Sequence, residues 1–299
     1  MYLNIMNYLN LRYNFACFSA MFLWAFGFPA AEVLLESWGS LTLVFFRFFI
    51  TILILIPFWL FMEGLKIIQK APIFKSIIIG FIGWGLGGNL LIVGQKLSDP
   101  VTTAICAAMM PIFGAIVELI YDRRKMSFNI LIGISFALVG GYLATGVRFS
   151  DGQFGLGAII CILAVILFAW GTRASTKGLS NLTYLGQSAL TMTGGTIASL
   201  VFCLVSLIFG LSETKVGNLD YYHIILLLIF VLVSQTISQT IWILGSGQLG
   251  VLLASLHSNG LPFYVMLIIR IFFGGSWNWM QALGAFIVGV GVIVAQIRK

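Results

Sequence analysis

Residues 101–124 read VTTAICAAMMPIFGAIVELIYDRR, an apolar run that contains Pro111 and ends in charged residues. A helix that crosses the hydrocarbon core of a bilayer needs about 20 apolar residues, because each residue adds only about 1.5 Å to its length. The run has that length, and basic residues directly after it are typical of the cytoplasmic end of a span. We therefore predict a membrane-spanning helix here.

The composition extends this prediction to the whole chain. Of its 299 residues, 60% are hydrophobic and 8% are charged, whereas soluble domains carry roughly 25% charged residues. The 16 Lys and Arg and 9 Asp and Glu residues are too few to cover a water-soluble protein of this size. The positive charges are scattered singly, which excludes the basic face that a nucleic-acid partner requires.

The cysteines give no sign of a metal or disulfide framework. Each lies inside an apolar run without the spacing of metal ligands, namely Cys17, Cys106, Cys161 and Cys203. They are expected to be small buried side chains. We predict no cofactor and no metal, and the chain has no Walker sequence for direct use of ATP.

Comparable apolar runs recur along the chain and predict ten spanning helices. Their approximate limits are 14–35, 40–62, 73–94, 99–121, 128–147, 154–175, 182–210, 221–244, 249–273 and 277–297. The runs are continuous rather than alternating, which excludes a transmembrane barrel. The breaks between them are too short for an aqueous domain. The expected fold is an all-α integral membrane protein whose function resides in the helix bundle.

Lys and Arg in the short loops predict the orientation, because cytoplasmic loops carry an excess of them. With the N-terminus inside, the cytoplasmic side holds eleven, which are Arg12, Lys66, Lys70, Lys75, Arg123, Arg124, Lys125, Arg173, Lys177, Arg298 and Lys299. The outer side holds four, which are Lys96, Arg148, Lys215 and Arg270. Both termini are therefore predicted to be cytoplasmic, which requires an even number of helices.

The chain also contains an internal repeat. An offset of 151 residues aligns Gly94 with Gly245, Pro111 with Pro262, Gly133 with Gly284 and Gly140 with Gly291. An offset of 144 aligns LWAFG at residues 23–27 with LFAWG at residues 167–171. Two five-helix halves follow, residues 14–147 and 154–297. Because five is odd, the second half enters the membrane with opposite polarity, and a binding site is expected near the midplane between the halves.

These elements resemble the drug/metabolite transporter superfamily in its bacterial ten-helix form with two EamA-type domains. The resemblance is carried by LWAFGFP, by the arginine of LVFFRFF, by residues 101–124, and by their second-half counterparts LFAWG and VLLASLHSNGLPFYVMLII. It implies a plasma-membrane protein whose cavity is lined mainly by the first, third, fourth, sixth, eighth and ninth helices. The family usually has an acidic residue after each Pro-containing helix. Asp122 provides one, whereas FFGGSWN in the second half has none.

Polar side chains inside spans are the natural candidates for a binding site, because lipid-facing polar groups are costly. On the eighth helix Gln235, Gln239 and Trp242 share one face at i, i+4 and i+7. On the ninth, His257, Asn259 and Tyr264 surround Pro262. We predict that these six side chains bind substrate, with His257 as a candidate proton-coupling group. Hydrogen bonding between helices is the alternative role for each of them.

Aromatic and charged residues complete the predicted site. Trp24, Trp84 and Trp170 lie within spans, away from the membrane interface where Trp concentrates, so they are expected either in the cavity walls or in plain helix packing. Arg47 either clamps a substrate carboxylate, pairs with Glu32 or extends to the interface.

The predicted gating elements lie nearer the helix ends and at the prolines. Glu118 is expected at the cytoplasmic end in an ion pair or gate rather than as a proton carrier at the midplane. Arg173, at the inner end of the sixth helix, is expected either as an interface anchor or as the partner of Glu118 in a gate. Pro111 and Pro262 are expected to loosen their helices and so to allow the helices to bend.

The predicted function is secondary transport of a small organic metabolite by alternating access, in which the halves rock about the cavity. The resemblance favours export of an amino acid or related amphiphilic compound, driven by protons or by the substrate gradient. Import of a nucleoside-like or quaternary ammonium solute and a lipid-linked sugar flippase are the alternatives. An enzyme is disfavoured because the spans hold no paired carboxylates. The assembly is expected to be a monomer or a homodimer.

Overall fold

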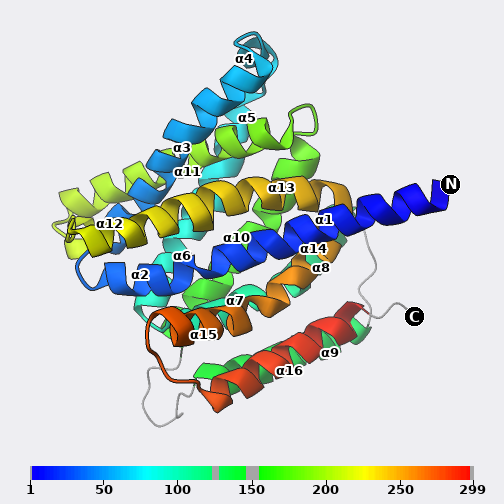
Figure 1. Cartoon of the computed structure of the whole chain (residues 1–299), viewed down its shortest axis with the longest axis vertical. Helices are drawn as coiled ribbons and strands as arrows, with labels where there is room; N and C mark the ends of the chain where they lie inside the picture. The colour runs from blue at the N-terminus through cyan, green and yellow to red at the C-terminus, as the bar shows by residue number, and fades with distance from the viewer. Residues whose placement is uncertain (1, 123–127, 146–154, 297–299) are drawn as a thin grey trace.

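The computed structural model describes residues 2–122, 128–145 and 155–296, and within these ranges every regular element is helical. Helices from both halves of the chain interleave in one bundle (Figure 1). The basic residues Arg123, Arg124, Lys125, Arg148, Arg298 and Lys299, which support the predicted orientation, lie outside the described residues.

Eight candidate spans stand where the sequence predicts them. They are Leu11–Leu35, Ser40–Glu63, Ile73–Lys96, Pro100–Asp122, Leu156–Gly178, Tyr184–Ile208, Tyr221–Leu249 and Val251–Phe272. The described residues also place helices at the remaining two predicted positions, α9 (Phe128–Thr145) and α16 (Trp279–Gln296). The ten-span count therefore stays a prediction, with helices present at all ten places.

Three spans are single helices, and the others are divided. The undivided ones are α3 (Ser40–Glu63), α10 (Leu156–Gly178) and α11 (Tyr184–Ile208). The first span joins the end of α1 (Tyr2–Ala25) to α2 (Gly27–Leu35), and the fourth joins α7 (Pro100–Ala108) to α8 (Met110–Asp122). The ninth consists of α14 (Val251–Ser255), the 3₁₀ turn η5 (Leu256–Gly260) and α15 (Leu261–Phe272).

The third and eighth spans each contain a π-helical segment. The third runs through α5 (Ile73–Ile79), η1 (Gly80–Leu86) and α6 (Gly87–Lys96). The eighth runs through α12 (Tyr221–Leu228), η4 (Ile229–Ile237) and α13 (Ser238–Leu249). Two short elements, α4 (Ile67–Lys70) and η3 (Ser212–Thr214), lie in connections. Single π-helical turns within α-helices are frequent at functional sites.

Pro29, Pro111 and Pro262 stand near helix starts, whereas Pro57 lies inside α3. Pro29 is the third residue of α2, Pro111 the second of α8 and Pro262 the second of α15. A helix start has no carbonyl partner for its first N–H groups, so proline costs little there. A break between two helices precedes Pro111 and Pro262, and the bending predicted at these prolines stays a prediction.

Glycines bring the helix backbones close together. A Cβ on Gly83 of η1 would lie 2.7 Å from Cα of Gly171 on α10, and one on Gly80 would lie 1.9 Å from the carbonyl oxygen of Thr191 on α11. Small residues of this kind let membrane helices associate by close packing. The π-helical segment η1 is therefore held between α10 and α11.

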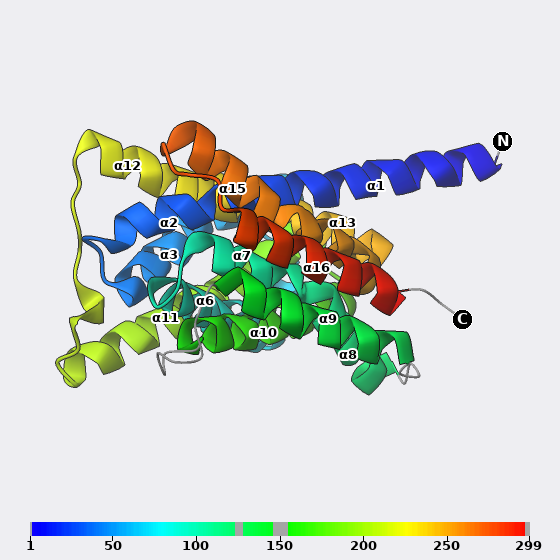
Figure 2. The ribbon, with the colours of Figure 1, turned by 90° about the horizontal axis from the view of Figure 1, so that it is seen from below.

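The helices α9 and α16 form a pair at one side of the bundle, where both views show them side by side (Figures 1 and 2). A Cβ on Gly140 of α9 would lie 2.6 Å from the carbonyl oxygen of Gly284 on α16. The fifth and tenth predicted helices thus pack against each other through small residues.

Candidate functional site

A cavity lies near the middle of several spans, between residues 14–147 and residues 154–297. The lining residues are Met21, Trp24, Val44, Arg47, Phe48, Trp84, Gly88, Leu91, Met110, Phe168, Ser234, Gln235, Ser238, Gln239 and Trp242. Its volume of about 40 Å³ is enough for a few water molecules. Both predicted halves of the chain supply its walls.

Aromatic rings form one wall of the cavity. Phe168 stacks on Trp84 with ring centroids 5.7 Å apart, and it meets Trp24 edge-on at 6.1 Å. The indole N–H of Trp84 donates to Ser175 Oγ at 3.3 Å, and that of Trp242 donates to Thr172 Oγ1 at 3.1 Å. Because α10 accepts both indole N–H groups, these tryptophans offer apolar ring faces to a bound molecule.

Amide side chains of the eighth span form the polar part of the wall. Gln235 donates from Nε2 to the thioether of Met192 at 3.1 Å, and a thioether is a weak acceptor. Gln239 is 9% exposed, and its Nε2 has no hydrogen-bond partner within the described part of the chain. Ser238 instead donates to the carbonyl oxygen of Ala20 at 2.9 Å. The side-chain amides of both glutamines therefore have N–H donors that lack a strong hydrogen-bond acceptor.

Arg47 enters the cavity from α3 and is 5% exposed. Its Nη2 donates to Oγ and to the carbonyl oxygen of Ser234, at 3.2 and 3.4 Å. Its Cζ lies 4.3 Å from the ring centroid of Phe230, a cation–π contact. The predicted pairing of Arg47 with Glu32 is absent: Glu32 accepts from Gln95 Nε2 at 3.3 Å, and no described carboxylate forms an ion pair with Arg47.

The ninth span contributes no residue to this cavity, contrary to the lining expected from the resemblance. His257 Nε2 lies 3.1 Å from Asn14 Oδ1 of α1. Tyr264 meets the rings of Phe18 and Phe22 edge-on, with centroids 5.9 and 5.6 Å apart. The 3₁₀ turn η5 changes the helical phase before Pro262, so these side chains pack on α1 instead. Asn259 lies in the same turn, and its buried Oδ1 has no partner among the described residues.

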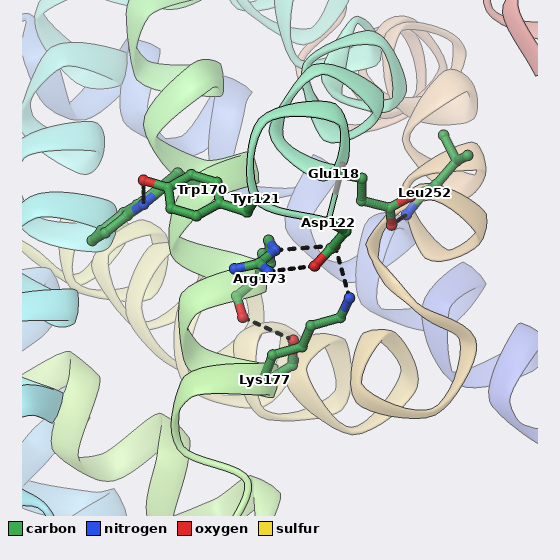
Figure 3. A network of polar contacts seen from close by, with 8 residues as sticks. Glu118, Tyr121, Asp122, Trp170, Arg173, Lys177 and Leu252 are labelled. Atoms are coloured by element: carbon green, nitrogen blue, oxygen red, sulfur yellow. Dashed lines mark hydrogen bonds and ion pairs between the residues drawn. The ribbon is translucent and has the colours of Figure 1, made fainter. Parts of the chain in front are cut away.

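Trp170 and the predicted gating residues Glu118 and Arg173 lie in one region, at the end of the bundle that the charge bias assigns to the cytoplasm (Figure 3). Arg173 and Lys177 of α10 both bind the carboxylate of Asp122, the lysine at 2.8 Å. Arg173 also lies 4.8 Å above the ring of Tyr121, whose hydroxyl accepts from Trp170 Nε1 at 3.0 Å. We call this cluster the Asp122 network. Trp170 therefore stands outside the cavity.

The predicted ion pair between Glu118 and Arg173 is absent among the described residues. Its Oε1 accepts from the backbone N–H of Leu252 at 3.4 Å, at the start of α14. Asp122 lies one turn further along α8, and this places its carboxylate opposite Arg173 and Lys177. The cytoplasmic-end ion pair predicted from the sequence therefore exists with a different carboxylate.

A second network lies at the opposite, predicted outer end. Glu213 of η3 accepts from Lys96 Nζ at 2.6 Å and from Ser40 Oγ at 2.7 Å and Ser40 N at 3.2 Å. Partial burial opposes ionisation of Glu213, but the hydrogen bonds from Lys96 and Ser40 outweigh it and lower its pKa from the ordinary value. We call this cluster the Glu213 network. It joins the connection after α11 to the start of α3, through Ser40, and to the end of α6, through Lys96.

Residues 11–146 match the EamA-like transporter family. The chain carries an EamA-family domain. This domain covers almost the whole first predicted half, and the predicted resemblance to the drug/metabolite transporter superfamily is confirmed. Within the described residues, no three His, Cys, Asp or Glu side chains gather closely enough to hold a metal ion.

Two curated relatives and one solved structure are similar to this EamA-domain chain. The uncharacterized transporter YdfC of Bacillus subtilis (strain 168) is 25% identical over 188 residues, which are 60% of this chain but only 58% of that protein. The uncharacterized transporter YyaM of the same organism is 25% identical over 258 residues, 83% and 82% of the two chains. A solved crystal structure of a protein that is 14% identical has a TM-score of 0.71. The match covers 95% of this chain and 96% of that chain. The last likeness shows the fold alone.

Sequence reasoning missed some of the cavity wall of this EamA-domain protein. Phe168 lines the cavity, whereas Trp170, two residues further along α10, does not. The offset of 144 residues already aligned Phe168 with Trp24, so the repeat contained the signal. Residues two apart point to nearly opposite sides of a helix, which is why only one of the pair faces inward. Ser234 and Ser238 were recognisable as neighbours of Gln235 and Gln239.

Proposed function

We propose that the chain is a secondary transporter that moves a small organic metabolite across the membrane by alternating access through this cavity. The observation that carries the proposal is a cavity near the middle of the spans whose walls come from both predicted halves. Transporters built from inverted repeats bind substrate near the midplane at the repeat interface. Relatives named as transporters agree with this function.

The dimensions of the cavity support alternating access. A volume of about 40 Å³ is too small for an amino acid or similar metabolite, so the walls must separate to admit one. The Asp122 network lies at the predicted cytoplasmic end and the Glu213 network at the predicted outer end, where each can act as a gate. Each network consists of exposed or partly exposed ion pairs, which are individually weak and can break during a cycle.

We further infer that residues 14–147 and 154–297 are two inverted repeats, and that the direction is export of an amino acid or related amphiphilic compound. Two pairs of equivalent spans share irregularities that support the repeat: π-helical segments in the third and eighth spans and breaks in the fourth and ninth. The first span is divided, whereas the equivalent sixth span is the single helix α10. The substrate class and the direction follow the resemblance to the drug/metabolite transporter superfamily that the sequence carries. Import of a nucleoside-like or quaternary ammonium solute is the alternative that the same assay tests.

Transport by purified protein in proteoliposomes, measured with labelled amino acids and organic cations, tests this function. Trp24→Ala and Gln239→Ala remove cavity walls and should lower flux at least about ten-fold if each contact contributes to substrate binding. Trp279→Ala, at a 79% exposed residue, and Gln248→Ala, at an exposed position of α13, are the matched controls and should retain flux. Flux that neither cavity substitution alters would place the pathway elsewhere.

The same vesicles distinguish the energy sources. A proton gradient imposed across the membrane should accelerate uphill flux of a proton-coupled substrate and leave facilitated exchange unchanged. His257→Gln removes the titratable ring that lies beside Asn14. Loss of gradient-driven flux with retained exchange would assign proton coupling to His257.

A further inference from the structure

The cavity carries a single formal charge. Arg47 is the one charged residue among the cavity-lining side chains, and the rest are apolar, aromatic, amide or hydroxyl groups. A bound molecule therefore meets a positive potential at one point of the wall. In a medium of low polarity such a potential is stronger than in water, and it repels cations.

The guanidinium of Arg47 is incompletely satisfied. It has five N–H bonds, and the structure pairs Nη2 with Ser234 while the buried Nε has no hydrogen-bond partner. Across the described residues no carboxylate forms an ion pair with it, and Phe230 offers only a ring face. A buried charge without a counterion is costly, so a ligand that supplies the counterion gains binding energy from the protein.

Further donors stand in the same cavity. The Nε2 of Gln239 is buried without a partner, and that of Gln235 contacts only the sulfur of Met192. The facing wall consists of the apolar faces of Trp24, Trp84 and Phe168. The cavity therefore combines spare donors and one positive charge with an aromatic surface, which is the complement of an amphiphilic anion.

We propose that the substrate is an organic acid whose carboxylate binds the guanidinium of Arg47 while its apolar part packs on Trp24, Trp84 and Phe168. This inference rests on the proposed function and names its substrate class. A carboxylate matches the planar fork of arginine and its single charge, whereas a phosphate dianion would leave one negative charge uncompensated. An organic cation would face Arg47 with no acidic residue in the wall to neutralise it.

Binding to the purified full-length protein in lipid nanodiscs, measured by isothermal titration, tests the proposal without requiring transport. The probes are matched sets on phenyl, indolyl and isobutyl bodies, each as the acid, its primary amide and the corresponding amine. We expect at least one acid to bind about 30-fold or more tightly than its amide, and no amine to bind comparably. The proposal is overturned if no acid is preferred to its amide in any set, or if an amine binds as tightly as the acid.

Substitutions of Arg47 then test whether this residue carries the preference. Arg47→Met should abolish the difference between acid and amide, and Arg47→Lys should keep part of it, because a point charge remains without the planar fork. Arg270→Met is the control, since Arg270 lies at the end of α15 outside the cavity, and it should keep the wild-type preference. Replacing an unpaired buried charge by an apolar side chain is commonly tolerated, so the Met variant should melt no lower than wild type.

The outcomes separate this inference from the proposed function. Acid-selective binding without flux in proteoliposomes would retain the carboxylate site and contradict transport. Flux of an amide or amine, with no flux of the acid, would retain transport and contradict the carboxylate site. An Arg47→Met variant that keeps the acid preference would also overturn the role of Arg47.

Discussion

At the scale of single residues, Glu213 shows how a connection can hold helices together. Its carboxylate accepts hydrogen bonds from Lys96 at the end of α6 and from Ser40 at the start of α3. The neighbouring backbone adds a bond from Gly39 N to the carbonyl oxygen of Lys215 at 2.8 Å. A Cβ on Gly39 would lie 2.2 Å from the carbonyl oxygen of Glu213, so only glycine permits this contact.

The lowered pKa of Glu213 predicts a pH dependence of stability. Its folded pKa lies below the ordinary 4.5, so its ionised form stabilises the fold above pH 4.5, and this contribution disappears as pH falls through the folded value. Glu213→Gln should lower the melting temperature at pH 7 by no more than about 2 °C, because the group is partly exposed and screened. The difference between variant and wild type should vanish at acid pH and shrink in high salt.

Thermal melts of the purified protein across this pH range measure the effect. Lys215→Gln, next to the same contacts but without an ion pair among the described residues, is the control. A Glu213→Gln difference that grows as the pH falls would contradict the assigned direction of the pKa shift.

How far the sequence predicts the candidate site depends on whether the helical phase is continuous. The i, i+4, i+7 spacing predicts one shared face for Gln235, Gln239 and Trp242, and all three residues line the cavity. On the ninth span the same reasoning failed for His257 and Tyr264, because the 3₁₀ turn η5 interrupts the phase between them. The periodicity of one helix also gives no information on which neighbouring helix packs against a given row of its side chains.

At the scale of elements, composition and length predict the spans well because a bilayer imposes both. The predicted limits 40–62 and 182–210 differ by one or two residues from α3 and α11. The interruptions were less predictable. Proline marked the fourth and ninth spans, whereas the π-helical segments η1 and η4 contain no proline, and the glycines of η1 act through their packing partners on other helices.

The close approach of η1 to α10 gives a prediction for helix packing. A Cβ at Gly83 would lie 2.7 Å from Cα of Gly171, and backbone atoms cannot move aside as a side chain can. Gly83→Ala should therefore lower the free energy of unfolding by about 1–3 kcal/mol. Gly247→Ala on α13 is the control, because its nearest atom would be Thr176 Cγ2 at 3.8 Å, and alanine there should be neutral or stabilising by up to about 1 kcal/mol.

Denaturation of both variants in the same detergent measures the difference. Equal stability of Gly83→Ala and wild type would mean that η1 and α10 separate easily, and that the tight contact does not hold the π-helical segment in place.

At the scale of the whole molecule, the two halves meet in the cavity at equivalent positions. Trp84 and Gly88 of the third span lie 151 residues before Gln235 and Gln239 of the eighth, and all four line the cavity. Trp24 and Phe168, which are 144 residues apart, are in edge-on ring contact in one wall of the cavity. The repeat places matching helices around one centre, while the residue types have diverged. The third span therefore contributes an aromatic ring and a glycine to the cavity, whereas the eighth span contributes two amide side chains at the equivalent positions.

If the halves are inverted, equivalent connections must lie on opposite sides of the membrane. Leu97, after the third span, is 151 residues before Gln248, at the end of the eighth, and both are exposed. With both termini inside, a membrane-impermeant maleimide should label Leu97→Cys in intact cells and Gln248→Cys only after permeabilisation. The native cysteines interfere little, because Cys17, Cys106 and Cys161 are buried and Cys203 is half-buried. Labelling in the reverse order would keep the inversion and reverse the orientation. Labelling of both from the same side would contradict an inverted repeat, because only an odd number of spans per half places equivalent residues on opposite faces.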